Sequence, residues 1–149
     1  METMNIGRPG RYITFQISGK YFAMPAERIR EMMPMQPIAP WAADSPGVLG
    51  AVQSRGRMIP IFDLRTELRL KARGSSRQES LIVVKSHDDY EFAFPVDKLT
   101  DMIVVHAHEI RQSTILGHGR IRNIVDVDGI VNQERLFAAA FSRISCSSL

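Results

Sequence analysis

The chain has 149 residues, 44% hydrophobic and 23% charged, which suits one globular domain and excludes disordered and fibrous classes. Its apolar runs are far shorter than the roughly 18 residues that a membrane helix needs, and its first residues lack the apolar core of a secretory signal. The net charge is +3. Because Cys146 is the single cysteine, the chain cannot form an internal disulfide. We therefore expect a cytoplasmic protein without direct membrane insertion.

The first 33 residues predict a hairpin followed by a short helix. Apolar and polar residues alternate over 12–17, which is typical of a half-buried strand. Ser18-Gly19 predicts a turn into a second strand over 20–24. Pro25 then favours one or two helical turns through Met33, because proline is accepted at the first helical position. Residues 1–10 and 142–149 are expected to be flexible termini.

The segment 47–65 is the most informative part of the chain. Two apolar runs, 48–52 and 58–62, flank the polar turn Ser54-Arg55-Gly56-Arg57. Gly56 supplies the positive φ that a tight hairpin turn needs, and Asp63 is placed to cap a short helix. Such a turn presents Arg55 and Arg57 outward, and the segment contains no side chain suited to be a base or nucleophile. It is therefore interpreted as a recognition surface.

The second half of the chain predicts further strands and one closing helix. Residues 81–85, 92–97 and 99–105 read as strands, and 120–130 contain the last one. Asn132 can cap a helix over 132–141 whose apolar residues share one face. The polar Gly/Ser-rich stretch 71–80 is the expected seam between two lobes. Many short strands with few helices favour an all-β fold with a minor helix.

No complete catalytic or metal-binding set is present in the sequence. His106 and His108 would share one face of a strand, but Glu109 would point to the other face, so a third ligand is lacking. Asp126-Val127-Asp128-Gly129 lacks the other ligands and flanking helices of an EF-hand, and is interpreted as a strand end. No nucleophile elbow, phosphate loop or dinucleotide fingerprint occurs. We expect no enzymatic activity, no metal and no cofactor.

At the 47–65 segment the chain resembles the CheW-like domains of bacterial chemosensory systems. Their pattern is an apolar strand, Asn-Leu-Arg-Gly, a second strand containing proline, and Asp-Leu-Arg. Here Arg55-Gly56, Pro60 and Asp63-Leu64-Arg65 match, while Gln53-Ser54 replaces Asn-Leu. Residues 28–32 look like the family's Val-x-Glu-Ile segment. The opening hairpin, the later strands and the closing helix match in order, so that the resemblance spans roughly 11–141.

The resemblance implies a single domain over 11–141, built as two side-by-side five-stranded β-barrels plus a short C-terminal helix. It also implies a cytoplasmic chemotaxis adaptor of a two-component system, a scaffold that couples a chemoreceptor tip to a CheA-type histidine kinase. The partner-binding residues carried over are Ile29, Glu31, Arg55, Gly56 and Arg57. If the family resemblance is set aside, the sequence favours plainer interpretations. Ile29 is then a core residue, Glu31 a solvated residue at a helix end, and Arg55 a turn arginine exposed to water.

Three other functions remain open at this point, of which a small enzyme is the weakest, because the sequence offers no site for it. A CheW-like adaptor for a non-chemotaxis pathway, such as twitching motility or gene regulation, would share every motif. A basic small barrel that binds nucleic acid is less favoured, because the basic stretch 65–77 has no aromatic residues interleaved with its charges. No nucleic-acid partner is therefore expected.

Overall fold

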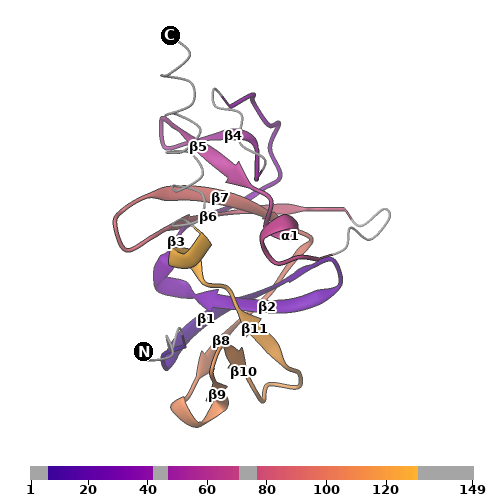
Figure 1. Cartoon of the computed structure of the whole chain (residues 1–149), viewed down its shortest axis with the longest axis vertical. Coiled ribbons are helices and arrows are strands. Elements are labelled where there is room, and N and C mark those ends of the chain that lie inside the picture. Colours follow the sequence, from indigo (N-terminus) through magenta and orange to yellow (C-terminus); the bar gives the residue numbers. More distant parts are fainter. Residues whose placement is uncertain (1–6, 42–46, 71–76, 131–149) are drawn as a thin grey trace, which may run out of the picture.

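Two β-sheets organise the residues that the structure describes, which are 7–41, 47–70 and 77–130 of a computed structural model (Figure 1). The strands before residue 63 are β1 (Gly10–Ile17), β2 (Lys20–Pro25), β3 (Ile29–Pro34), β4 (Val48–Ser54) and β5 (Arg57–Phe62). The later strands are β6 (Ser80–Lys85), β7 (Glu91–Val96), β8 (Lys98–Val105), β9 (Ile110–Arg111), β10 (Thr114–Ile115) and β11 (Arg122–Ile124). The short helices are η1 (Ala26–Arg28), α1 (Leu64–Glu67) and η2 (Ala107–Glu109).

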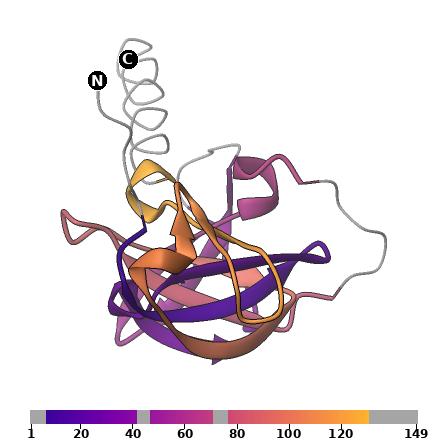
Figure 2. The ribbon, with the colours of Figure 1, turned by 90° about the horizontal axis from the view of Figure 1, so that it is seen from below.

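The six-stranded sheet has the order β8-β1-β2-β11-β10-β9. Its centre is the β1–β2 hairpin, in which Ile17 pairs with Lys20. The intervening Ser18 and Gly19 have φ values of 52° and 76°, as the two loop residues of a tight hairpin require. The predicted opening hairpin is thereby confirmed. Figure 2 views the molecule from the end that carries β8–β11.

The five-stranded sheet has the order β3-β6-β7-β5-β4. Its two edge strands approach each other through side chains and the connector that follows β3. The Ser54 hydroxyl on β4 donates a hydrogen bond of 2.5 Å to the Glu31 carboxylate on β3. In the connector, Ala39 and Ala51 of β4 exchange backbone hydrogen bonds of 2.9 and 2.8 Å. The sheet is therefore strongly curled, so that β3 lies near β4 although each is an edge strand.

Three apolar clusters account for the burial of both sheets. One cluster lies between the sheets and includes Phe15, Phe62, Phe92 and Phe94. The rings of Phe62 and Phe92 stack at 4.6 Å, and those of Phe15 and Phe94 lie 5.6 Å apart. The other two clusters are each formed within one sheet; Val83 belongs to the five-stranded sheet's cluster and Tyr12 to that of the six-stranded sheet. Alternate residues of β6 thus enter different clusters, as period-two strand geometry dictates.

The helix predicted to run from Pro25 through Met33 is wrong beyond residue 28. Only η1 is helical, and β3 begins at Ile29. Within β3, half-buried and exposed residues alternate, and Met33 pairs with Leu81 of β6. This segment therefore follows a two-residue period, and pairing with β6 outweighs the local helix signal of Pro25.

Of residues 71–80, the expected seam between two lobes, 71–76 lie outside the described residues and Ser80 is the first residue of β6. The strands on both sides, β5 and β6, belong to the five-stranded sheet. The chain changes sheet at η1 and again at Asp97, between β7 and β8. The chain changes sheet at these points because β1 pairs with β8 and β2 with β11.

At the end of the described chain, the predicted last strand is shorter than expected. β11 covers Arg122–Ile124, and residues 127–130 are already helical. The Asp126 carboxylate accepts a hydrogen bond of 3.1 Å from the Gly129 N–H, which caps this helical turn, so Asp126 starts a helix rather than ending a strand. The helix predicted over 132–141 lies outside the described residues. The predicted all-β class with minor helices is confirmed.

Candidate partner-binding site

The β4–β5 hairpin ends in a two-residue loop formed by Arg55 and Gly56. Ser54 and Arg57 are the last paired residues, and the loop residues have φ values of 52° and 77°. Positive φ at both positions is the requirement of a type I′ turn, whose twist matches that of the strands. The predicted positive φ of Gly56 is confirmed. That Arg55 shares this left-handed conformation was not predicted, and it fixes the direction in which Arg55 leaves the backbone.

Three arginines converge on the carboxylate of Glu91, the first residue of β7. Arg30 Nε and Arg55 Nη2 lie 3.1 and 3.2 Å from Glu91 Oε2, and Arg57 Nη1 lies 3.3 Å from Oε1. The Glu91 side chain is only 6% exposed, whereas the arginine side chains are 41%, 51% and 69% exposed in the same order. The side chains of Arg55 and Arg57 are therefore exposed to solvent and are also paired with the buried carboxylate of Glu91.

Glu31 is joined to the same turn from the other side. Its carboxylate accepts the hydrogen bond from Ser54, whose side chain is buried directly before Arg55. The Ser54 hydroxyl is thus paired, so its burial leaves no unsatisfied donor. Ile29 is half-buried and packs against the cluster between the sheets, apart from the ion pairs. The structure accordingly brings Glu31, Arg55, Gly56 and Arg57 together, and gives Ile29 a packing contact.

Sequence reasoning missed two members of this group, Glu91 and Arg30. Glu91 lies far along the chain and reaches the turn only because β7 lies beside β5 in the sheet. Arg30 is the extra residue of a β-bulge, since Ile29 pairs with Val84 and Glu31 with Val83. A bulge re-aims the side chain of its extra residue. No local motif in the sequence announces either feature.

Three of the four histidines, His106, His108 and His118, lie at the six-stranded sheet, around η2 and the loop before β11. Glu109 Oε1 accepts a hydrogen bond of 2.8 Å from the His106 N–H, and its Oε2 lies 3.2 Å from His118 Nε2. The pKa of Glu109 is lowered, first by the hydrogen bond from His106 and then by His118. His106 was expected to lie in a strand, but it directly precedes the 3-10 helix η2. Its ring stacks on that of His108, with 5.8 Å between the ring centroids. Within the described ranges, no three His, Cys, Asp or Glu side chains are arranged to hold a metal ion.

A groove of about 900 Å³ lies between the two sheets and is lined by residues of both signs of charge, among them Arg11, Arg28, Glu27 and Asp126. Asp128 accepts hydrogen bonds from Arg28 Nη2 at 3.0 Å and from the His87 N–H at 2.8 Å. These contacts give Asp128 a structural role in tying η1 to the loop after β6. Asp128 lies in the helical turn 127–130, so the interpretation of this segment as a strand end is wrong.

Among the described helices, none has the length and apolar character needed to cross a membrane. In the described part of the basic stretch, Arg65 lies within α1 and Arg69 follows that helix. The Arg65 guanidinium lies 3.2 Å from the Asp63 carboxylate. Asp63 also accepts a hydrogen bond from the Arg65 N–H and so caps α1, as predicted.

Comparison with known proteins gives a consistent result. The chain is 24% identical to the chemotaxis protein CheW of Bacillus subtilis (strain 168) over 146 residues, which cover 89% of this chain and 93% of the relative. It is 30% identical to the chemotaxis protein CheW of Helicobacter pylori (strain ATCC 700392 / 26695) over 102 residues, covering 67% and 60%. The fold is similar to the crystal structure of scaffolding protein TtCheW from Thermoanaerobacter tengcongensis, with a TM-score of 0.72 and 16% identity over 80% of this chain and 90% of that one.

The sequence pattern of the CheW-like domain family matches residues 11–140, which is nearly the whole chain. The match includes both sheets and the hairpin with its arginine turn. The chain belongs to the CheW-like domain family.

Proposed function

We propose that this chain is a chemotaxis adaptor that couples a chemoreceptor to a CheA-type histidine kinase in the cytoplasm. The proposal rests mainly on the geometry of the β4–β5 turn in this chain, which belongs to the CheW-like domain family. It offers the half-exposed guanidinium of Arg55 on a backbone of fixed geometry, beside Gly56 and Arg57. A rigid, charged, convex turn suits recognition of another protein, because little side-chain and backbone freedom is lost on docking.

The receptor surface in this proposal comprises Ile29, Glu31, Arg55, Gly56 and Arg57. Glu31 and Arg55 supply charges of opposite sign within one small region, which can fix the register of a helical receptor tip. Ile29 supports β3 from the core side through its packing. This geometry and the family membership support the role that we propose for each residue toward the receptor.

The kinase surface would lie elsewhere, at a strand edge. β8 is an edge strand of the six-stranded sheet, and its Met102 and Val104 are 58% and 54% exposed. Exposed apolar side chains on an edge strand are unusual in a monomer, which normally protects such edges. A regulatory barrel of the kinase could cover this edge.

Two interfaces on one rigid body would let the receptor state bias the kinase state through differential contacts. In the same proposal residues 11–141 form one domain, and each curled sheet acts as a small barrel with its own interior cluster. The Ser54–Glu31 bond and the Ala39–Ala51 pairing support closure of the five-stranded sheet. The chain would supply no catalytic group of its own, so that its activity is scaffolding.

The proposal is tested by asking whether both partners bind at once. The full chain is mixed with a receptor cytoplasmic fragment and a CheA-type kinase, and the mass of the complex is measured by analytical ultracentrifugation. We expect a ternary complex and a receptor-dependent change in kinase autophosphorylation. Competition between the two partners for one site, or failure to bind the kinase, would contradict the proposal.

A further inference from the structure

Glu91 is an acid whose burial needs an explanation. It begins β7, the middle strand of the five-stranded sheet, and its side chain is 6% exposed. A buried carboxylate is costly unless it is paired and hydrogen-bonded. In this chain the partners come from two separate elements, the β3 bulge and the β4–β5 turn.

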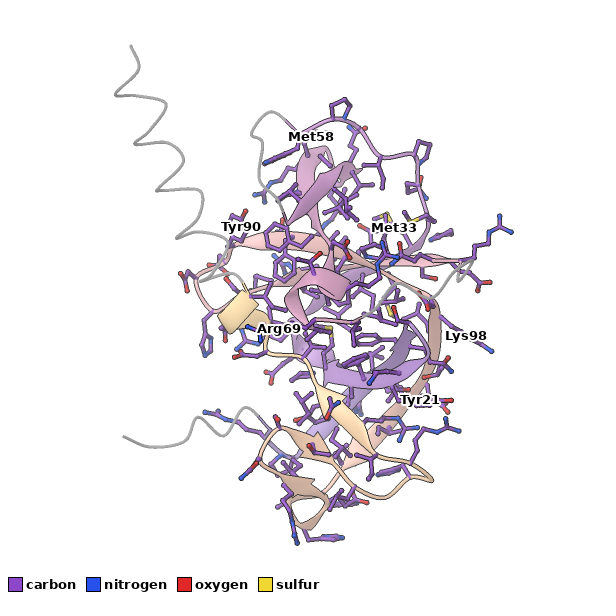
Figure 3. The ribbon with its side chains drawn as sticks, turned by 45° about the vertical axis from the view of Figure 1, so that its right-hand side comes forward. Tyr21, Met33, Met58, Arg69, Tyr90 and Lys98 are labelled. Carbon is purple, nitrogen blue, oxygen red and sulfur yellow. The ribbon has the colours of Figure 1, made fainter. Side chains whose placement is uncertain are left out.

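Each of the three arginines reaches Glu91 by a special backbone feature. Arg30 is the unpaired residue of the bulge, Arg55 has a φ of 52°, and Arg57 is the first residue after the turn. Figure 3 labels Tyr90 and Met58, which are the chain neighbours of Glu91 and Arg57. The β3 bulge and the β4–β5 hairpin therefore bring three guanidiniums to one carboxylate.

The group is not electrically balanced. Three guanidiniums face one carboxylate, which leaves the group a formal charge of +2. Each guanidinium has five N–H donors, and each contact to Glu91 is made by one of its nitrogens. The remaining donors point from side chains that are 41% to 69% exposed. The excess charge and the exposure of these side chains together match a carboxylate from outside the chain.

We propose that Glu91 is a positioning residue that gathers Arg30, Arg55 and Arg57 into one binding cluster for carboxylates, and that its occupant is an acidic segment of the receptor tip. The identity of that occupant rests on the proposed function, whereas the cluster and its preference for carboxylates rest on the contacts of Glu91. Without Glu91 the three guanidiniums repel one another and spread into solvent.

If Glu91 has this positioning role, replacing it should change the affinity for an acidic partner in the opposite direction to that expected from net charge alone. Replacing Glu91 with Gln raises the positive charge of the surface, so an acidic partner should bind more tightly if only net charge mattered. If Glu91 organises the cluster, the same change should weaken binding. We expect Glu91→Gln to weaken binding of the receptor cytoplasmic fragment about tenfold. Asp101→Asn, which makes the same charge change on β8, should alter it less than about twofold.

A second readout does not need the receptor. The Arg Nε–Hε signals of the ¹⁵N-labelled chain are followed by NMR while a hexaglutamate peptide is added, with hexaglutamine as the neutral control. In the unmodified chain the signals of Arg30, Arg55 and Arg57 should be resolved and should shift together with hexaglutamate only. In Glu91→Gln they should move toward the position of free arginine and respond weakly. Arg30→Gln, outside the turn, should weaken the response of the other two while leaving the melting temperature nearly unchanged.

The outcomes separate the inference from the proposed function. Equal or tighter binding of acidic probes by Glu91→Gln, or no response of the unmodified chain to hexaglutamate, would overturn the inference. A normal hexaglutamate response that depends on Glu91, combined with no binding of the receptor fragment, would leave the cluster standing and contradict the proposed function. If Glu91→Gln does not fold, Arg30→Gln decides the matter through the same signals.

Discussion

Gly50 offers a sharp test of how the curled five-stranded sheet is held. A Cβ at this position would lie 2.2 Å from Ile38 Cγ2 and 2.5 Å from the Ala39 carbonyl oxygen. Its φ of +153° is also a conformation that other residues rarely adopt. Gly50→Ala should therefore disturb the connector at the point where Ala39 pairs with Ala51.

The magnitude has two parts. The unfavourable φ costs about 1–3 kcal/mol, and forcing a methyl group into a packed contact costs about 1–3 kcal/mol more. The expected loss in the free energy of unfolding is thus about 2–6 kcal/mol. Gly10 is a matched control, because its φ is +148° but nothing lies within 4 Å of its Cβ position. Gly10→Ala should therefore lose only the part of the free energy of unfolding that comes from the unfavourable φ.

Urea unfolding of the unmodified chain, Gly50→Ala and Gly10→Ala gives the comparison, with far-ultraviolet circular dichroism as the signal. Ile38→Ala in the Gly50→Ala background should recover part of the loss only, since the carbonyl oxygen of Ala39 remains in place. Equal losses in the two glycine variants would refute the close approach of the connector to β4. If Gly50→Ala left the free energy of unfolding unchanged, the positive φ of Gly50 would be refuted as well.

Two further changes test the core and the η2 region. Phe94→Ala should lower the free energy of unfolding by about 3–5 kcal/mol, because the ring is fully buried between the sheets against Phe15; a loss below about 1 kcal/mol would show that the sheets do not share this core. Glu109→Gln should reduce the melting temperature at neutral pH, and the deficit should disappear in acid. The pKa of Glu109 is lowered in the fold by the His106 hydrogen bond, so its contribution is present above the ordinary glutamate pKa of about 4.3 and is lost as pH falls below it. A deficit of the same size at acidic and neutral pH would contradict this explanation.

The strands and the turn could be predicted because their signals are local. Alternating residues of β1, the Ser18-Gly19 turn and the Arg55-Gly56 turn each specify their own geometry within a few residues. The N-cap at Asp63 has the same local character. Such signals do not depend on which strands become neighbours, and therefore they survive folding unchanged.

The errors and omissions concern what only the tertiary fold decides. Pro25 is a sound helix start, yet the following segment forms β3 because β6 offers it a partner. The Gly/Ser-rich stretch 71–80 has linker composition, but composition does not reveal that the strands on either side share a sheet. The contacts of Glu91 depend on the order of β7 and β5 and on a bulge at Arg30, which no sequence period encodes.

The adaptor mechanism depends on two separable surfaces, and Arg55 tests it most directly. Glu91 keeps Arg30 and Arg57 when Arg55 is removed, so Arg55→Ala should change the free energy of unfolding by about 1 kcal/mol or less. If Arg55 is desolvated against a receptor carboxylate, its loss should weaken receptor binding by about 2–5 kcal/mol.

The decisive measurement is titration of the receptor fragment and of the kinase against the unmodified chain and Arg55→Ala, with a melting curve for each. Val104→Arg on the β8 edge is the reciprocal variant and should weaken kinase binding while sparing the receptor. We predict that Arg55→Ala loses receptor affinity, keeps kinase affinity and melts nearly as the unmodified chain does. Equal loss of both affinities with an unchanged melt would mean one shared surface and would contradict the adaptor mechanism.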